Sequence, residues 1–252
     1  MRNNFDRRKF CLSAGGAVVA IAIGSGCRHG LNDANDGRLS ARPREGVKTA
    51  GQGRIMLELD RDRDAILQLP RNLSTAVPLL VFLHGAGQSA DDMFGYLGSV
   101  PEEAGVAVLA PHSRDHSWDA IGGSFGPDVE FLNRSLQRVF DTAAIDPARV
   151  AIGGFSDGAS YAVSLGLING DLFTHVVGCS PGFVIEGDRH GESRFFISHG
   201  TSDHILPIDR CGRRVVAGLK ARGYDVIFRE FDGDHEIPVE VAREAMSFIL
   251  GR

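Results

Sequence analysis

The sequence lacks several features that would point to particular classes of protein. No stripe rich in Lys and Arg appears in the body of the chain, and the net charge is −5, which together argue against a nucleic-acid partner. There is no internal repeat, and no apolar run reaches the ~20 residues that a membrane-spanning helix needs. What remains is an ordinary soluble composition, with 43% hydrophobic and 23% charged residues in a chain of 252, long enough for one domain.

Cysteine is also scarce, and two of the four cysteines lie near the N-terminus. In that region the basic residues Arg7 to Lys9 precede a short apolar run over 14–23, which is typical of a bacterial export signal. The stretch from Asp6 to Leu12 resembles a twin-arginine signal. We therefore expect residues 1–27 to direct export, and the protein to be periplasmic or associated with the cell envelope.

The cysteines leave two questions open. Gly24 to Cys27 resembles a lipoprotein cleavage site, so Cys27 either carries a lipid that attaches the protein to a membrane or does not. Cys179 and Cys211 belong to the body of the chain, where an oxidising compartment would let them pair. Two buried thiols that pack as small apolar side chains are the favoured interpretation. Nothing in the sequence indicates the oligomeric state.

The order of the elements predicts the class of fold. Residues 28–53 are polar and rich in Gly, which is typical of a flexible linker, so the domain is expected over 54–252. In that domain, short apolar segments alternate with segments of helical spacing, which predicts an α/β fold with a mostly parallel sheet and helices on both faces. Strands are expected at 55–59 and 65–69, as an antiparallel hairpin at the edge, and at 79–83, 106–110, 150–152, 175–178, 195–198 and 226–231. Helical patterns cover 129–139, 159–167, 215–219 and 239–250.

One motif predicts a catalytic nucleophile. Gly154-Phe155-Ser156-Asp157-Gly158 lies between an expected strand and an expected helix, which is the setting of the G-x-S-x-G nucleophile elbow. The sharp turn would lift the Ser156 hydroxyl above the strand ends, and the two glycines would let the strand and helix approach each other. The alternative is a glycine-rich turn with a capping serine.

A serine hydroxyl needs a base to take its proton, and the base needs an acid to orient it. Asp203 follows the strand at 195–198, and His235 follows the last expected strand, which gives the chain order Ser, Asp, His of this fold. We expect Ser156, Asp203 and His235 to be catalytic, with Asp209 as the alternative acid. His199 and His204 lie too close to the acid to be the base.

The third requirement is an oxyanion hole. His84-Gly85-Ala86-Gly87 follows the apolar strand at 79–83, where the fold supplies one backbone N–H. We assign this donor to Ala86, with Gly87 as the alternative, and the second donor to Asp157, the residue after the nucleophile. His84 is expected to be a structural residue that fixes the loop.

The loop 112–127 and the acid loop are expected to surround the substrate. Trp118 and Phe125 are candidates for the wall of a substrate pocket, together with Ile205 beside the acid. The equal alternative is a surface loop whose tryptophan is anchored by packing. No large insertion separates the last strands, so no lid domain is expected.

These motifs together resemble the phospholipase/carboxylesterase family of α/β-hydrolases, which includes acyl-protein thioesterases, and the resemblance extends to the secreted polyester depolymerases. The similarity covers nearly all of residues 55–252. It implies hydrolysis of small-molecule carboxylic esters by a Ser-His-Asp triad without a metal or cofactor. Ala86 and the N-terminal export segment depart from the family pattern. A thioesterase or lysophospholipase with the same triad is the alternative, and a peptidase or a non-catalytic binding protein is less favoured.

Overall fold

The computed structural model describes residues 36–71 and 76–252. The expected export signal, with Cys27, lies outside these residues and stays a prediction. Within the described part of the chain, no helix has the length and apolar character to cross a membrane.

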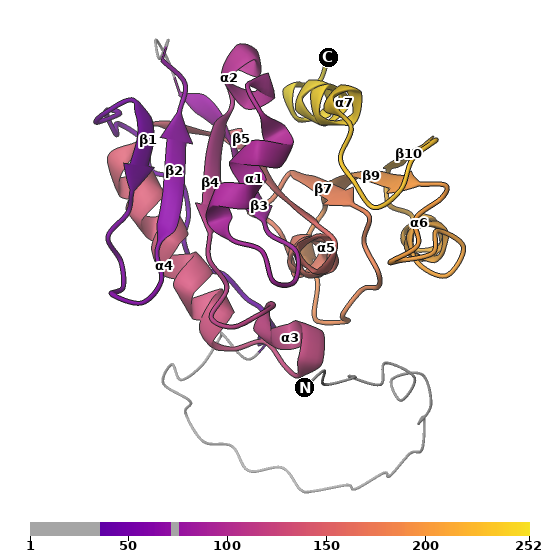
Figure 1. Ribbon diagram of the computed structural model, residues 1–252. Helices are drawn as coiled ribbons and strands as arrows, with labels where there is room; N and C mark the ends of the chain where they lie inside the picture. The colour runs from indigo at the N-terminus through magenta and orange to yellow at the C-terminus, as the bar shows by residue number, and fades with distance from the viewer. Residues whose placement is uncertain (1–35, 72–75) are drawn as a thin grey trace, which may run out of the picture. The chain divides into compact units, whose positions relative to one another are not determined.

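A central sheet of eight strands organises the domain, in the order β1-β2-β4-β3-β5-β7-β9-β10 (Figure 1). Strands β1 and β2 form the antiparallel hairpin expected at the edge, and β2 also runs antiparallel to β4, whereas all other neighbours in this sheet are parallel. The strands are β1 (Gly53–Met56), β2 (Ala65–Leu69), β3 (Val77–Leu83), β4 (Ala107–Pro111), β5 (Ile145–Phe155), β7 (His175–Cys179), β9 (Arg194–Gly200) and β10 (Val226–Phe231), with a separate short pair β6 (Asn169–Gly170) and β8 (His190–Gly191).

Helices cover both faces of this sheet because its central strands are apolar on both sides. In β3, Leu79, Val81 and Leu83 belong to one core cluster, to which α4, α5 and α6 contribute. Leu80 and Phe82 belong to the opposite cluster, with α1, α2 and α7. The helices are α1 (Ala90–Leu97), α2 (Val100–Ala104), α3 (Asp119–Gly122), α4 (Pro127–Thr142), α5 (Asp157–Ile168), α6 (Gly212–Ala221) and α7 (Val239–Leu250).

Three short helices were absent from the sequence prediction. Helix α1 begins with a capping box between Ser89 and Asp92, which satisfies backbone N–H groups at its start. Helix α2 has Pro101 in its first turn and ends at Gly105, which has a positive φ. Helix α3 is a single turn in the loop 112–127. Segments this short carry too few apolar positions to show helical spacing.

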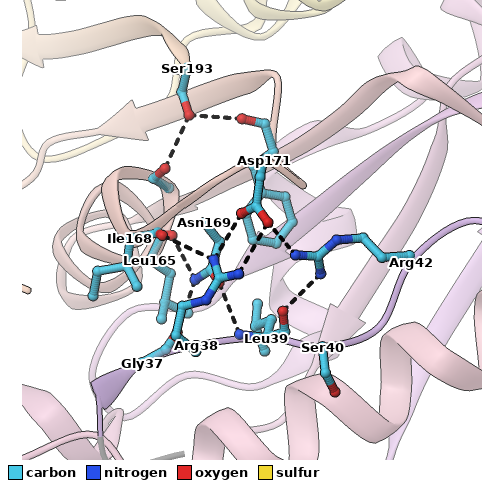
Figure 2. A network of polar contacts seen from close by, with 12 residues as sticks. Gly37, Arg38, Leu39, Ser40, Arg42, Leu165, Ile168, Asn169, Asp171 and Ser193 are labelled. Carbon is cyan, nitrogen blue, oxygen red and sulfur yellow. Dashed lines mark hydrogen bonds and ion pairs between the residues drawn. The ribbon is translucent and has the colours of Figure 1, made fainter. Parts of the chain in front are cut away.

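The expected linker over 28–53 is not a free linker in its described part. Leu39 and Ala41 are buried in the core, and the backbone N–H of Leu39 donates to Asn169 Oδ1 at 2.9 Å. Figure 2 shows Arg38 and Arg42 converging on Asp171. We call residues 36–44 the strap. The prediction was wrong here because a polar composition can also describe a segment whose polar groups all find partners.

Asp171 is the anchor of the strap. Its carboxylate accepts from Arg38 Nη1 at 2.8 Å and from Arg42 Nη2 at 2.5 Å. The hydrogen bonds from Arg38, together with those from Arg42, hold the pKa of Asp171 well below its usual range. The strap therefore contributes most when this carboxylate is ionised.

Candidate active site

Ser156 lies at the turn between β5 and α5, with φ 58° and ψ −119°. A positive φ is strained for a residue with a side chain, and such strain is found mostly where surrounding structure enforces it. Here the N–H of Ser156 donates to the Cys179 carbonyl at 2.9 Å, which ties the turn to the neighbouring strand β7. The elbow geometry expected from the motif is present.

The two glycines of the motif are required by close packing. A Cβ on Gly154 would lie 2.5 Å from the carbonyl group of Gly158, and one on Gly158 would lie 2.3 Å from the Leu83 carbonyl oxygen. Both contacts are with backbone atoms, which cannot rotate away. The absence of side chains therefore lets α5 start directly above the ends of β3 and β5.

The structure brings Asp203 and His235 into contact, although 32 positions separate them in the chain. His235 Nδ1 lies 2.7 Å from Asp203 Oδ2, and the Asp203 side chain is fully buried. The other oxygen, Oδ1, accepts the N–H groups of Ile205 at 2.9 Å and Leu206 at 2.7 Å. This leaves Nε2 of His235 as the ring nitrogen available for a reacting group.

His235 also packs beside the nucleophile turn. Its ring packs against Phe155, the residue before Ser156, at an interplanar angle of 37° and with 4.6 Å between ring centroids. Its side chain keeps 14% exposure, so the imidazole is held by protein on most sides and still open at one edge. The base expected from the sequence therefore lies next to the turn that carries the serine.

The alternative acid, Asp209, and the neighbouring histidine His204 both have other partners. Asp209 is exposed and pairs with Arg213 at 2.6 Å. His204 is exposed and contacts Asp234 at 3.0 Å. Asp234 accepts the backbone N–H groups of His204 and His235 at 3.0 and 2.9 Å, and so links the loop that carries Asp203 to the loop that carries His235.

The loop expected to form the oxyanion hole, which we call the oxyanion loop, lies against Ser156. A Cβ on Gly85 would lie 3.2 Å from the Ser156 Cβ, so no side chain separates the two. The N–H of Gly87 donates to the His116 carbonyl at 2.7 Å and is unavailable as an oxyanion donor. The N–H of Ala86 has no acceptor among the described residues, which leaves it free for a substrate oxygen.

Side chains around this loop fix its shape. His84 is buried, its Nε2 accepts the N–H of Ser113 at 2.9 Å, and its Nδ1 lies 2.8 Å from the Gly85 carbonyl. Burial lowers the pKa of His84, so the ring is neutral at neutral pH. Gln88, which the sequence analysis did not single out, accepts the Gly85 N–H at 2.9 Å. His84 has the structural role expected of it.

Trp118 and Phe125 are packing residues, which corrects the expectation that they form a pocket wall. Trp118 is 2% exposed, stacks on Tyr161 and donates its Nε1–H to the His84 carbonyl at 2.8 Å. Phe125 is buried against Tyr161 and the strap residue Gly37. A substrate could not reach side chains this deeply buried. The loop therefore supports the oxyanion loop from behind.

Ile205 is the one expected pocket residue that remains accessible. It follows Asp203 by two positions and is 59% exposed. A Cβ added to Gly182 would lie 3.6 Å from the Leu206 side chain, and the N–H of Gly182 donates to Ser160 Oγ at 2.9 Å. A hollow of about 330 Å³ opens beside Gly182, between the segment 182–186 and α6.

Cys179 and Cys211 are free, buried thiols. Burial raises the pKa of Cys179 to about 11, so this thiol is not ionised at neutral pH. Within residues 36–71 and 76–252 no group of three or more His, Cys, Asp or Glu side chains is arranged to hold a metal ion.

The sequence of this region matches a known family. Residues 128–250 match the Phospholipase/Carboxylesterase family. The match contains the positions of Ser156, Asp203 and His235 and confirms the resemblance that the motifs indicated. Acyl-protein thioesterase 1 of Gibberella zeae is 25% identical over 130 residues, which are 48% of this chain and 54% of that protein. Feruloyl esterase C of Emericella nidulans is 25% identical over 157 residues, 58% of this chain and 57% of that protein.

The alignments span only 42% to 57% of the length of the curated relatives that the chain matches. The similarity to solved structures extends over a larger share of both chains. The fluorophosphonate-binding serine hydrolase FphF of Staphylococcus aureus has a TM-score of 0.64 and 16% identity, over 79% of this chain and 99% of that one. The carboxylesterase of Bacillus cereus has a TM-score of 0.58 and 18% identity, over 75% and 94%. These likenesses confirm the α/β-hydrolase fold.

Proposed function

We propose that the protein is a serine esterase that hydrolyses small-molecule carboxylic esters through an acyl-enzyme on Ser156. The observation that carries the proposal is the 2.7 Å contact between His235 and Asp203, with the His235 ring packed against Phe155 in the strained turn that carries Ser156. The names of the relatives, esterases and thioesterases, support the same class of reaction.

The proposed reaction has two halves. His235 Nε2 takes the proton of Ser156 Oγ, which attacks the ester carbonyl, and the N–H groups of Ala86 and Asp157 stabilise the oxyanion. As the tetrahedral intermediate collapses, His235 returns the proton to the leaving alcohol. Water then attacks the acyl-enzyme by the same route and releases the acid and Ser156. Asp203 stays ionised and orients the imidazole throughout.

Replacing the nucleophile tests this proposal. Ser156→Ala should lower turnover of p-nitrophenyl esters by roughly 10⁶-fold, the scale reached when a nucleophile of this type is removed. A labelled fluorophosphonate probe should modify the wild type and not the variant, since only an activated serine reacts. Asp209→Ala is the matched control and should keep wild-type turnover. Turnover retained in pure Ser156→Ala protein would falsify the proposal.

A thioesterase is the second candidate, because two of the curated relatives are named acyl-protein thioesterase 1. The two chemistries use the same residues and differ in the leaving group. Pairs of oxygen esters and thioesters with the same acyl chain, compared by kcat/KM, separate them. A preference for the thioester member of each pair would favour the thioesterase.

We further propose that residues 1–27 export the protein and that it acts in the periplasm or cell envelope. The basis is the sequence alone. A variant with Lys at positions 7 and 8 should accumulate inside the cell when fractions are compared by immunoblot. If Cys27 is lipidated, Cys27→Ala should move the exported protein from the membrane fraction to the soluble fraction.

A further inference from the structure

His199 is a buried histidine in contact with the proposed acid. It lies near the end of β9, four positions before Asp203, and its side chain is fully buried. Its Nε2 lies 2.7 Å from the Leu206 carbonyl oxygen and 3.2 Å from Asp203 Oδ2. Oδ2 is the same oxygen that contacts His235 Nδ1 at 2.7 Å. One carboxylate oxygen therefore faces two imidazole rings.

The protonation of His199 follows from its partners. A carbonyl oxygen can only accept, so the nitrogen beside Leu206 must carry the proton. Burial lowers the pKa of His199, so the ring is neutral and Nδ1 is left with a lone pair. Nδ1 is buried and has no hydrogen-bond partner among the described residues. The backbone of Gly212 packs against it, since a Cβ on Gly212 would lie 2.5 Å from Nδ1.

An unpartnered polar atom in a protein interior costs free energy, and an apolar side chain of similar size would avoid that cost. Packing alone therefore does not account for a histidine at this position. The feature that an apolar side chain cannot supply is the Nε2–H, which lies within reach of both Leu206 and Asp203.

We propose that His199 is a positioning residue of the active site, whose Nε2–H is shared between the Leu206 carbonyl and Asp203 Oδ2 and holds that carboxylate in the orientation His235 needs. This inference rests on the proposed function. Oδ1 of the buried carboxylate accepts two backbone N–H groups, whereas Oδ2 lies 2.7 Å from His235 Nδ1 and 3.2 Å from His199 Nε2. Without His199, Oδ2 keeps one donor.

The loss of that donor has a predictable electrostatic effect. A carboxylate with fewer donors keeps more of its negative charge available to His235 and stabilises the protonated imidazole more strongly. In a plot of kcat/KM against pH, the fall on the acid side, which reflects protonation of His235, should then move to higher pH. We call this fall the acid limb. The other titratable groups facing this cluster are Glu230 on β10, Cys211 before α6, and Asp234 and His204 in the loops around the acid and base. None of these residues is substituted in the variants described next.

Two substitutions isolate the donor. His199→Met removes the N–H and keeps an apolar side chain, whereas His199→Gln can supply an amide N–H at about the position of Nε2. We expect His199→Met to lower kcat roughly tenfold, with KM little changed and the acid limb shifted upward, as for loss of a hydrogen bond that orients a catalytic group. His199→Gln should recover most of kcat and the wild-type limb. His175→Met, at a buried histidine on β7, controls for the general effect of such a replacement.

The outcomes separate the possible roles. Wild-type kcat and an unmoved acid limb in folded His199→Met would overturn the inference. So would a loss of kcat that leaves the limb in place and is not recovered by His199→Gln, because that pattern indicates packing alone. Should His199→Met not fold, a His199→Gln enzyme with kcat no higher than that of the His199→Asn enzyme overturns it, since Asn is too short to reach both acceptors. Failure of the proposed function would instead appear as turnover in Ser156→Ala.

Discussion

Trp118 illustrates how one side chain can support a site that it does not line. Its ring fills space between Tyr161 and His84, and its Nε1–H donates to the His84 carbonyl. His84 in turn holds the Gly85 carbonyl and the Ser113 N–H. The tryptophan therefore acts on the oxyanion loop through the backbone that precedes it.

Trp118→Phe should lower the free energy of unfolding by about 1–3 kcal/mol, because the buried His84 carbonyl loses its donor. The relative rates toward p-nitrophenyl esters of increasing chain length should not change, because the side chain lies out of reach of substrate. Ile205→Ala is the contrasting variant: it should alter that ranking with little effect on stability, since Ile205 is exposed beside the acid. A changed ranking in Trp118→Phe would restore the pocket-wall interpretation.

At the scale of the element, the junction of β5 and α5 depends on backbone contact. Gly158→Ala would put a methyl group 2.3 Å from the Leu83 carbonyl oxygen, at the start of the oxyanion loop. We expect the free energy of unfolding to fall by about 3 kcal/mol, the upper range for overpacking. We also expect kcat to fall, because the added methyl group displaces the oxyanion loop.

Gly95→Ala is the matched control for that variant, because Gly95 lies in α1 with no atom within 4 Å of the added Cβ. It should stabilise the protein by up to about 1 kcal/mol, the helix preference of Ala over Gly. Urea denaturation compares the two. Equal effects of the two substitutions would contradict the close packing at the elbow.

The strap is the second element whose attachment can be tested. Asp171→Asn should lower stability at neutral pH by about 1 kcal/mol, a modest value because the ion pairs are partly exposed. The pKa of Asp171 is depressed by the two arginines, so its contribution is present above the unfolded pKa of about 3.9 and is lost as pH falls further. The difference between variant and wild type should therefore shrink below about pH 4.

Urea denaturation at several pH values measures this difference. Asp225→Asn, which removes a more exposed pair with Arg194, should have a smaller effect at every pH. A deficit in Asp171→Asn that is constant from pH 7 to pH 3 would show that charge is not the reason for its contribution.

Across the described part of the chain, three buried histidines are expected to give a common response of stability to acid. Burial is the largest cause that lowers the pKa of His84, His175 and His199. A histidine with a depressed folded pKa binds fewer protons folded than unfolded, so acid favours unfolding. Stability should fall as pH drops below about 6.5, by up to about 1.4 kcal/mol per pH unit for each histidine.

Replacing one of the three should weaken this dependence. His175 lies at the start of β7, where it contacts Phe248 edge to face, and it is not one of the proposed catalytic residues. His175→Phe is therefore a suitable variant. Its unfolding free energy, measured between pH 5 and pH 8, should decline less steeply with acid than that of the wild type. An identical slope would contradict the role of burial at this histidine.

Local patterns in the sequence are enough to predict the fold class and the order of the main strands and helices. The central strands are apolar runs, α4 carries an apolar stripe and α5 is buried along nearly its whole length. The sequence also predicted the nucleophile turn, since Gly154 and Gly158 are needed for a contact that the chain makes with its own neighbours. His235 and Asp203 could be nominated because each follows a strand.

Features that depend on distant partners could not be predicted from local patterns. The polar composition of residues 28–53 predicts a linker, but Arg38 and Leu39 in the strap donate to Asp171 and Asn169, more than a hundred positions away. The sequence does not show that Trp118 is buried, or that the N–H of Gly87 donates to the His116 carbonyl. The short separation of His199 and Asp203 in the chain argues against His199 as the base, but it does not predict their contact, which depends on how the loop folds back. Burial and pairing are properties of neighbours in space, and no local pattern encodes them.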